Sequence, residues 1–321
     1  MMKKFLITGH TGFVGRYFID FLEENKIKSI VLGIDTVYKK EKIVYEYVEV
    51  IDVQVDLLDI CSIEKTLDSF QPDYILHLAS YSSVAFSWKN PVLSFQNNMN
   101  IFLNLVESVR KLEMSSRILS VGSSEEYGNV NAAHLPLTES SLLDPISPYA
   151  VARVSQGFLS KVYTEGYKLN IIITRSFNHI GPGQKDIFVI SSFAKQIAKF
   201  KQQGLSQGTI ITGDLSIVRD FVDVRDVVRA YYLLLTKGEI GEIYNICSGQ
   251  GIALHQIIEK LSIISGIEVS TQINPDYVRL NDNKKIIGSY DKIYKYLQWK
   301  PEISIEKSLS DIYNSWLNHP E

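Results

Sequence analysis

The chain has 321 residues, of which 45% are hydrophobic and 21% are charged, and its formal net charge is −3. This composition is typical of a globular protein with a sizeable core, and the length suits one large domain or two closely joined ones. No run of Lys or Arg predicts a nucleic-acid surface, and no apolar run reaches membrane-spanning length. Cys61 and Cys247 are far apart and not in a metal-ligand spacing. Residues 1–4 lead straight into a short apolar strand, which is too short and wrongly flanked for a signal peptide. We therefore expect a reduced, cytoplasmic protein.

The N-terminal part of the chain predicts a strand, a glycine-rich turn and a helix. Residues 4–8 form an apolar run, and a G-x-x-G-x-x-G spacing follows it, just before a stretch of helical periodicity. Glycines at such a turn let the backbone approach a pyrophosphate, which the N-terminus of the next helix attracts. The alternative is that they serve only tight packing of strand against helix. The residues expected to bind a dinucleotide here are Gly9, Thr11, Gly12, Phe13, Val14 and Gly15.

The second expected strand, 29–34, ends at Asp35. An acid at this position would accept hydrogen bonds from both hydroxyls of an adenosine ribose and would repel a 2′-phosphate. We therefore expect NAD as the cofactor, with NADP as the alternative because Lys39 and Lys40 lie close by. Two more strands are expected at 44–50 and 53–57, where Asp56 and Leu57 would border the adenine.

Strands and helices continue to alternate, which predicts an α/β fold with a parallel, doubly wound sheet. The apolar strand 73–80 ends in small residues, so a cofactor can lie flat across the carboxyl edge of the sheet. His77, inside this strand, is interpreted as a core histidine. A long helix is expected over 95–112. The cofactor-binding candidates from these two elements are Leu78, Ala79, Ser80 and Asn98.

The next expected strand, 117–121, runs into GSSEEYG and places Ser123 and Ser124 at its carboxyl end. Open α/β sheets hold their ligands at this edge, and a serine hydroxyl there can donate to a substrate oxygen. Glu125 and Glu126 are adjacent, and only one of them can point the same way as Ser123. Glu125 is either a general base or a solvated loop acid, and both readings stay open.

Tyr149 and Arg153 stand four residues apart in SPYAVARVSQGFLSKVYTEGY, which reads as a helix with Ser147 as N-cap and Pro148 in its first turn. The spacing puts the phenol and the guanidinium on one face, one turn apart. A cation there would stabilise the phenolate and make Tyr149 a usable acid or base near neutral pH. The alternative is an ordinary Tyr and Arg on an amphipathic helix.

The C-terminal half predicts a smaller mixed domain over the carboxyl edge of the sheet. A polar loop at 176–184 is a candidate substrate-binding segment. Asp220, Asp223 and Asp226 precede or begin a helix, and the arginines among them favour capping over a metal site. Arg219 and Arg279 are candidate diphosphate clamps, because a guanidinium binds phosphate in bidentate fashion.

Four motifs together resemble the extended short-chain dehydrogenase/reductases that act on nucleotide sugars: TGHTGFVG, the strand end at Ser123, Tyr149 with its cation, and VRDFVDVRDVVRAY. FNHIGPGQ, RDFVDVRDVV and YNICSGQ are most similar to the GDP-4-keto-6-deoxy-D-mannose reductases. This likeness implies a Rossmann domain of 1–175 plus about 213–245, and a nucleotide-sugar domain of 176–212 and 246–321. It also implies a homodimer through a four-helix bundle of the helices around 95–112 and 149–167.

The resemblance implies a role for each matching residue. Ser123 and Tyr149 would be catalytic with Arg153, and Glu125 would be the base if the protein were a dehydratase. Tyr149 and Arg153 would also contact the cofactor. The residues expected to hold the GDP-sugar are Ser123, Ser124, Glu125, Asn178, Val189, Arg219 and Arg279.

The sequence departs from the family at Arg153, where the family pattern Y-x-x-x-K has lysine. Arginine keeps the positive charge but in effect never releases its proton, so a relay through a neutral amine is excluded. The function that we expect is NAD(P)H-dependent reduction of the C4 keto group of a GDP-4-keto-6-deoxy sugar. The alternatives are a GDP-hexose or GDP-heptose 4,6-dehydratase and, in another class, a non-catalytic nucleotide-sugar or dinucleotide sensor.

Overall fold

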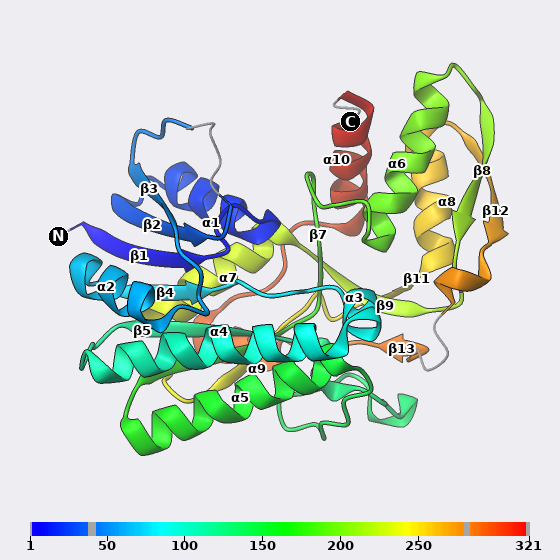
Figure 1. The fold of residues 1–321 in the computed structure, drawn as a ribbon. Helices are drawn as coiled ribbons and strands as arrows, with labels where there is room; N and C mark the ends of the chain where they lie inside the picture. Colours follow the sequence, from blue (N-terminus) through cyan, green and yellow to red (C-terminus); the bar gives the residue numbers. More distant parts are fainter. Residues whose placement is uncertain (1, 38–42, 279–282, 319–321) are drawn as a thin grey trace.

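The computed structural model describes residues 2–37, 43–278 and 283–318, and its main layer is a seven-stranded sheet (Figure 1). The strands are β1 (Lys3–Thr8), β2 (Ser29–Asp35), β3 (Val48–Gln54), β4 (Tyr74–His77), β5 (Arg117–Ser123), β6 (Asn170–Ser176) and β10 (Ile243–Ile246). Their order is β10-β6-β5-β4-β1-β2-β3, and every neighbouring pair is parallel. The order reverses between β1 and β4, which is the switch point of a doubly wound sheet. The predicted Rossmann sheet is confirmed.

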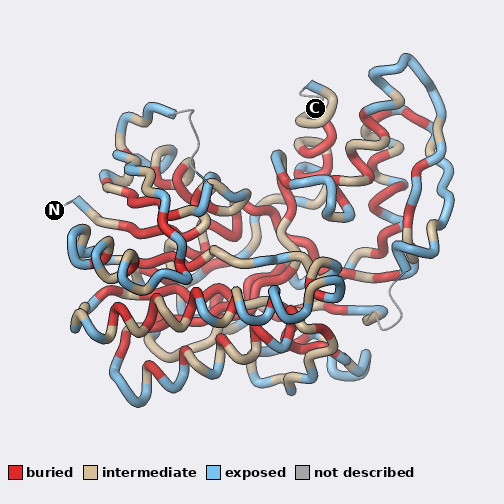
Figure 2. Tube along the Cα trace, viewed as in Figure 1, coloured by how far each residue is buried: buried red, intermediate tan, exposed pale blue. Residues whose placement is uncertain are grey.

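Helices cover both faces of this sheet, because successive side chains of a strand point to opposite faces. In β1, Phe5 and Ile7 pack into the core on one face, whereas Leu6 packs into the core on the other. Buried residues concentrate in the strands and along the inner sides of the helices (Figure 2). One face carries α1 (Phe13–Glu24), α7 (Val224–Lys237) and α9 (Asp291–Leu297), and the other carries α2 (Ile60–Phe70), α4 (Pro91–Lys111) and α5 (Pro148–Tyr167).

The prediction of two strands over 44–50 and 53–57 is wrong, because β3 is a single strand over 48–54. It pairs with β2 in one unbroken register from Ser29 opposite Val48 to Asp35 opposite Gln54. A continuous ladder satisfies the backbone groups of the whole segment, so the break expected after residue 50 does not occur. Asp56 and Leu57 consequently lie in the connection beyond the strand.

A smaller lobe stands to the right of the main sheet in Figure 1 and has its own apolar core. It contains a mixed sheet of β7 (Asn178–Ile180), β9 (Val218–Asp223), β11 (Gly251–Ala253) and β13 (Lys285–Ile286) and a parallel pair of β8 (Gln207–Thr212) and β12 (Glu268–Ile273). Its helices are α6 (Val189–Gln202), α8 (Leu254–Ser265) and α10 (Ile305–Asn318). The remaining short elements are α3 (Val84–Lys89), η1 (Ser124–Tyr127), η2 (Ala132–His134) and η3 (Pro275–Tyr277).

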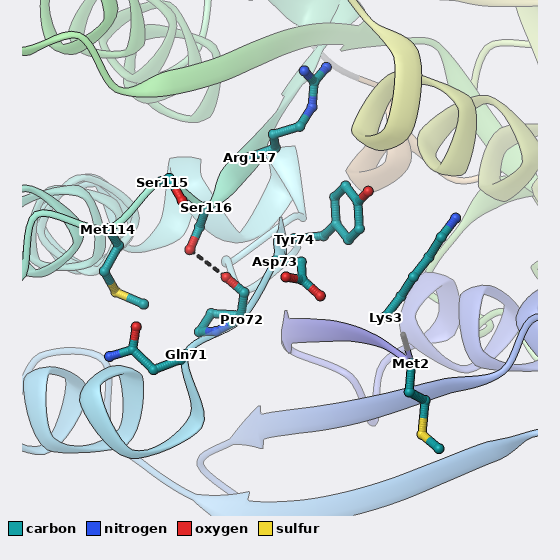
Figure 3. A pocket seen from close by; sticks show the side chains of 10 residues that line it. All are labelled: Met2, Lys3, Gln71, Pro72, Asp73, Tyr74, Met114, Ser115, Ser116 and Arg117. Atoms are coloured by element: carbon teal, nitrogen blue, oxygen red, sulfur yellow. Dashed lines mark hydrogen bonds between the residues drawn. The ribbon is translucent and has the colours of Figure 1, made fainter.

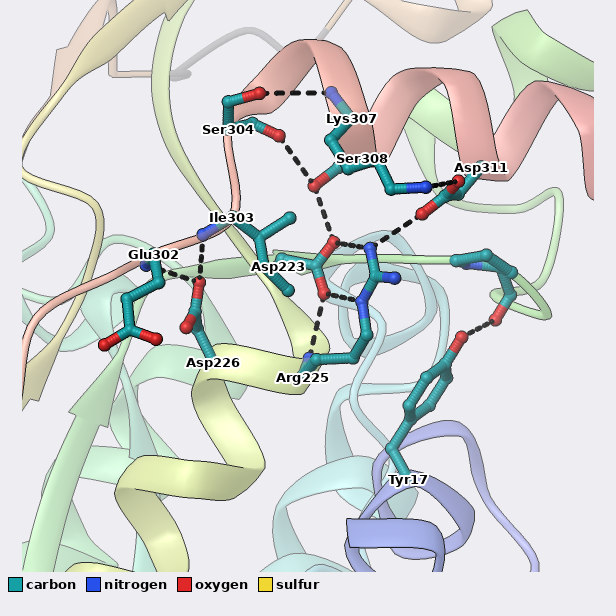
Figure 4. A network of polar contacts seen from close by, with 11 residues as sticks. Tyr17, Asp223, Arg225, Asp226, Glu302, Ile303, Ser304, Lys307, Ser308 and Asp311 are labelled. Atoms are coloured by element: carbon teal, nitrogen blue, oxygen red, sulfur yellow. Dashed lines mark hydrogen bonds and ion pairs between the residues drawn. The ribbon is translucent and has the colours of Figure 1, made fainter. Parts of the chain in front are cut away.

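A buried polar network fixes the junction between the two lobes (Figure 4). Asp223 caps α7 through the amide of Arg225, accepts two more hydrogen bonds from the guanidinium of Arg225, and accepts one from the hydroxyl of Ser308 in α10. Arg225 also pairs with Asp311 of α10 at 2.9 Å. Asp223 thus has the capping role that the sequence favours, and it ties the smaller lobe to the start of α7.

Candidate active site

The turn between β1 and α1 is shaped to let another group approach its backbone. Gly9 has φ of +70°, and a Cβ there would stand 3.1 Å from the backbone of Ala79. A Cβ at Gly15 would stand 2.5 Å from the carbonyl oxygen of His10, so the third glycine brings the helix tightly onto the turn. The helix starts at Phe13 after Gly12 without a side-chain cap, and the amides of its first turn point out of the helix. These features fit the pyrophosphate of a dinucleotide.

Asp35 ends β2 beside this turn, and two donors hold its carboxylate in place. The hydroxyl of Thr11 donates to Oδ2 at 2.5 Å, and the amide of Thr36 donates to Oδ1 at 2.8 Å. The glycine turn and the acid of the second strand are therefore in direct contact. Both lie at the carboxyl edge of the sheet, where the sequence places an adenosine ribose.

The end of β4 meets β1 at the switch point of the sheet. The hydroxyl of Thr8 accepts hydrogen bonds from the amides of Leu78 and Ala79, both at 3.1 Å, and lies 3.0 Å from Nδ1 of His77. The hydroxyl proton of Thr8 is thus free to be donated to Nδ1, which leaves the proton of the neutral imidazole on Nε2. That Nε2 is buried without a hydrogen-bond partner among the described residues. Burial, with Arg153 nearby, lowers the pKa of His77 to about 3.

Ser123 ends β5 and caps η1, where its hydroxyl accepts from the amide of Glu125 at 3.2 Å. Glu126 turns inward: it accepts from the amide of Ser123 at 2.8 Å and pairs with the guanidinium of Arg175 at 3.1 Å. Burial raises the pKa of Glu126, and Arg175 opposes that effect. Glu126 therefore holds the end of β5 from the buried side. Glu125 is the more exposed of the two glutamates, and Ser124 is buried.

Tyr149 and Arg153 lie on α5, whose N-terminus is capped by the hydroxyl of Ser147 at 3.1 Å from the amide of Ala150. Both side chains are buried, and Nε of Arg153 donates to the hydroxyl of Tyr149 at 3.3 Å. Nη2 of Arg153 donates to the hydroxyl of Ser80 at 2.5 Å. The phenol, the guanidinium and the end of β4 thus meet at the switch point.

The other candidate residues are distributed around this edge. Asn98 is buried, and both ends of its amide bind the backbone of Tyr81, so it holds the loop after β4. Asp56 accepts from the amide of Leu58 at 2.9 Å. Three of the candidates for the GDP-sugar lie in the smaller lobe: Asn178 begins β7, Val189 begins α6, and Arg219 is in β9. A fourth, Arg279, lies outside the described residues.

Arg219 is held in place by the smaller lobe. Its Nη1 donates to the carbonyl oxygens of Val218 at 3.1 Å and Asn283 at 2.6 Å. The next residue, Asp220, is buried and accepts four hydrogen bonds, two from Ser248 and one each from the amides of Gly249 and Gly288. Burial raises the pKa of Asp220 to about 6. Asp220 is a structural acid that joins three segments next to the candidate phosphate-binding arginine.

A separate hollow of about 400 Å³ lies at the opposite, amino edge of the main sheet (Figure 3). Lys3, Tyr74 and Arg117, which line it, begin β1, β4 and β5. Ser116 in its wall donates to the carbonyl oxygen of Pro72 at 2.6 Å, and Arg117 donates to the carbonyl oxygens of Leu235 in the last turn of α7 and of Gly238 just after it. Lys3, Ser116 and Arg117 already have protein partners, and the hollow lies at the edge of the sheet opposite the glycine turn, so it is not the candidate site.

Residues outside the sequence-based candidates complete the centre. Gln156 accepts from Arg153, Thr8 organises the end of β4, and the hydroxyl of Tyr231 lies 2.7 Å from that of Ser176. Gln156 follows Arg153 at a helical i+3 spacing, which is the one signal that could have identified it from the sequence. Thr8 and Tyr231 carry no such signal, because their partners are distant in sequence.

A doubly wound parallel sheet, a glycine turn at its switch point and a buried tyrosine–cation pair held against the strand that ends at Ser123 define an NAD(P)-dependent enzyme of the extended short-chain dehydrogenase/reductase class. Comparison with known proteins narrows this class. The family model described as GDP-mannose 4,6 dehydratase matches residues 6–312. The chain belongs to that family.

Individual relatives cover the chain almost completely. A GDP-6-deoxy-D-mannose reductase of Pseudomonas aeruginosa is 34% identical over 98% of both chains. The solved structure of RMD from Pseudomonas aeruginosa complexed with NADPH is 32% identical, with a TM-score of 0.85 over 99% of both chains. A UDP-glucose 4-epimerase of Thermotoga maritima with UDP-glucose is 28% identical, with a TM-score of 0.86 over 98% of this chain and 99% of the other.

Proposed function

We propose that the protein reduces the C4 keto group of a GDP-4-keto-6-deoxy sugar with NAD(P)H. The contact between Tyr149 and Arg153 at the switch point carries this proposal, together with the 34% identity to a GDP-6-deoxy-D-mannose reductase. The bound cofactor supplies the hydride. Ser123 donates a hydrogen bond to the carbonyl oxygen, and Tyr149 gives that oxygen its proton as the C4 alcohol forms. Arg153 keeps a positive charge beside the phenolate that remains.

The smaller lobe is proposed to hold the nucleotide. Arg219 is fixed beside Asp220 and would bind the diphosphate, with Asn178 and Val189 nearer the sugar and Arg279 as a further clamp. Ser124 and Glu125 would complete the sugar site. On the cofactor side, the carboxylate of Asp35 supports a preference for NAD, because it would face the 2′-phosphate of NADP.

The direct test is oxidation of NADH or NADPH in the presence of GDP-4-keto-6-deoxymannose, with the product sugar identified by mass spectrometry. We expect one reduced cofactor to be consumed for each GDP-6-deoxy sugar formed. Tight binding of both ligands without turnover would refute the proposal and would favour a non-catalytic sensor.

A dehydratase is the second candidate, because Glu125 lies next to Ser123 and the matching family model is that of GDP-mannose 4,6 dehydratase. Its base would remove the C5 proton of a GDP-hexose or GDP-heptose, and its cofactor would be recycled. Glu125→Gln separates the two reactions. It should abolish a dehydratase and leave at least a third of the reductase activity, and net consumption of added NAD(P)H excludes a pure dehydratase.

We also propose a homodimer through the outer faces of α4 and α5. Large apolar side chains are exposed there, and an apolar hollow lies between the two helix N-termini. These side chains are Val92, Leu93, Phe95, Val151, Phe158 and Val162. A second copy placing the same helices against them would form a four-helix bundle. Phe158→Glu should shift the protein to a monomer in analytical ultracentrifugation, and a wild-type monomer would refute the interface.

A cytoplasmic location is supported by the free thiols of Cys61 and Cys247. Within the described residues, no helix has the length and apolar character needed to cross a membrane.

A further inference from the structure

The guanidinium of Arg153 is held by a set of buried partners that suits an arginine. Nε donates to Tyr149, Nη1 donates to the carbonyl oxygen of Val121 at 2.9 Å and to Oε1 of Gln156 at 2.7 Å, and Nη2 donates to Ser80. A guanidinium has five N–H groups. Nε uses one, Nη1 uses two and Nη2 uses one of its two, so one N–H of Nη2 has no partner among the described residues.

A lysine could not make the same contacts. Its ammonium is a point charge with three donors, whereas the partners of Arg153 lie in three directions around a planar fork. The contact with Gln156 and the contact with Tyr149 are made by different nitrogen atoms of one rigid group. Whatever fixes Nη1 therefore fixes the direction of Nε toward the phenol.

Gln156 has only one amide orientation that fits its surroundings. Its Nε2 donates to the hydroxyl of Ser120 at 2.9 Å and to the carbonyl oxygen of Val121 at 3.3 Å, which leaves Oε1 facing Arg153. The reverse orientation would place an NH₂ group against a guanidinium. Ser120 is held in turn by Ser160 at 3.0 Å, and Gln156, Ser120 and Ser160 are all buried. The acceptor for Arg153 is thus preorganised by β5 and α5.

We propose that Gln156 is a positioning residue for the catalytic centre: it aims Arg153 at Tyr149 and leaves one N–H of Nη2 for the cofactor ribose. It touches neither substrate nor cofactor and acts only through Arg153. This inference rests on the proposed reductase function, because its kinetic test measures reductase activity. It accounts for an arginine at the position where the family pattern has lysine, because the arginine has a matched partner one turn along the helix.

The experiment is a double-mutant cycle with Arg153→Lys, Gln156→Leu and the double variant, all assayed as reductases. Gln156→Leu keeps the size of the side chain and removes the acceptor. A hydrogen bond to a charged group contributes about 1.5–3 kcal/mol, so we expect kcat to fall by about 10- to 150-fold while the KM for the GDP-sugar stays within about twofold. In the Arg153→Lys background the same change should cost less than about threefold.

Two further variants separate positioning from stability. Gln156→Glu restores an acceptor for Arg153 but loses the donor to the carbonyl oxygen of Val121, so it should recover part of the lost kcat. Ser108→Ala removes a buried hydroxyl that donates to the carbonyl oxygen of Asn104 in α4, outside this network, and its kcat should stay within about threefold of wild type. Equal losses from Gln156→Leu in both backgrounds, or a loss from Ser108→Ala as large as that from Gln156→Leu, would overturn the proposal.

A failed reductase assay leaves this inference testable. Wild-type protein that binds but does not turn over the substrate refutes the proposed function. The same double-mutant cycle is then measured as NAD(P)H affinity, from nicotinamide fluorescence. Gln156→Leu should weaken NAD(P)H binding several-fold when Arg153 is present and should not weaken it in the Arg153→Lys background. An unchanged affinity for Gln156→Leu would refute the positioning role.

Discussion

Replacing Asp35 by asparagine should change the preference between the two nicotinamide cofactors. The carboxylate is fixed by Thr11 and Thr36 at the end of β2, so it cannot easily turn away from a bound ribose. A 2′-phosphate on this ribose would bring its negative charge close to the carboxylate. Two unit charges near a protein surface repel by about 4 kcal/mol at 4 Å, which corresponds to a preference for NADH of more than about 100-fold.

Asp35→Asn keeps the shape and an acceptor for the amide of Thr36, and its NH₂ group can donate to the hydroxyl of Thr11, while the charge is removed. We expect kcat/KM to fall by about 3- to 10-fold with NADH, because the ribose loses a charge-assisted hydrogen bond, and to rise by about 10-fold with NADPH. Asp56→Asn is the matched control at the same edge, and it should affect both cofactors equally. A wild-type preference for NADPH, or an unchanged ratio in Asp35→Asn, would refute the reasoning. The test is demanding because the solved Pseudomonas aeruginosa relative is complexed with NADPH, the cofactor that this reasoning disfavours here.

Three other changes test the centre and its support. Tyr149→Phe should lower kcat by about 100- to 10,000-fold and leave NAD(P)H affinity within about threefold, because only the proton donor is lost; an active variant would show that another group protonates the product. His77 has its pKa lowered to about 3 from 6.5, so the unfolded chain takes up a proton that the folded chain refuses as the pH falls below 6.5. Its contribution to the free energy of unfolding should decrease by about 2 kcal/mol from pH 7 to pH 5, and urea unfolding of His77→Gln should show a correspondingly smaller decrease. Glu126→Gln leaves the charge of Arg175 buried without a counterion and should lower the free energy of unfolding by about 3–5 kcal/mol; a loss below 1 kcal/mol would contradict the buried pair.

Much of the fold could be predicted because its signals are local. The apolar run at 4–8, the glycine spacing after it and the Ser147–Pro148 helix start each depend on residues close in sequence. The alternation of such segments then specifies a parallel, doubly wound sheet. The prediction failed at 44–57, where local alternation suggested two strands, because the register with β2 is a non-local property.

The support of the site could not be predicted in the same way. Glu126 and Arg175 are 49 residues apart, and neither carries a local signal for pairing. The sequence indicates only that Glu125 and Glu126 cannot both face Ser123. Which of the two turns inward depends on β6, which lies further along the chain. Which glutamate is available to a ligand is thus decided by β6, through the buried charge of Arg175.

The same reasoning applies to the one departure from the family pattern. Read alone, an arginine four residues after Tyr149 suggests a damaged centre, because a lysine relay is lost. In the structure the extra N–H groups have buried acceptors, and one of these acceptors, Gln156, is useful only to a side chain with more than one donor nitrogen. A site without catalytic function would not need the buried amide of Gln156, which Ser120 orients toward the guanidinium of Arg153. The arrangement around Arg153 therefore favours an enzyme adapted to arginine over a sensor that has lost its chemistry.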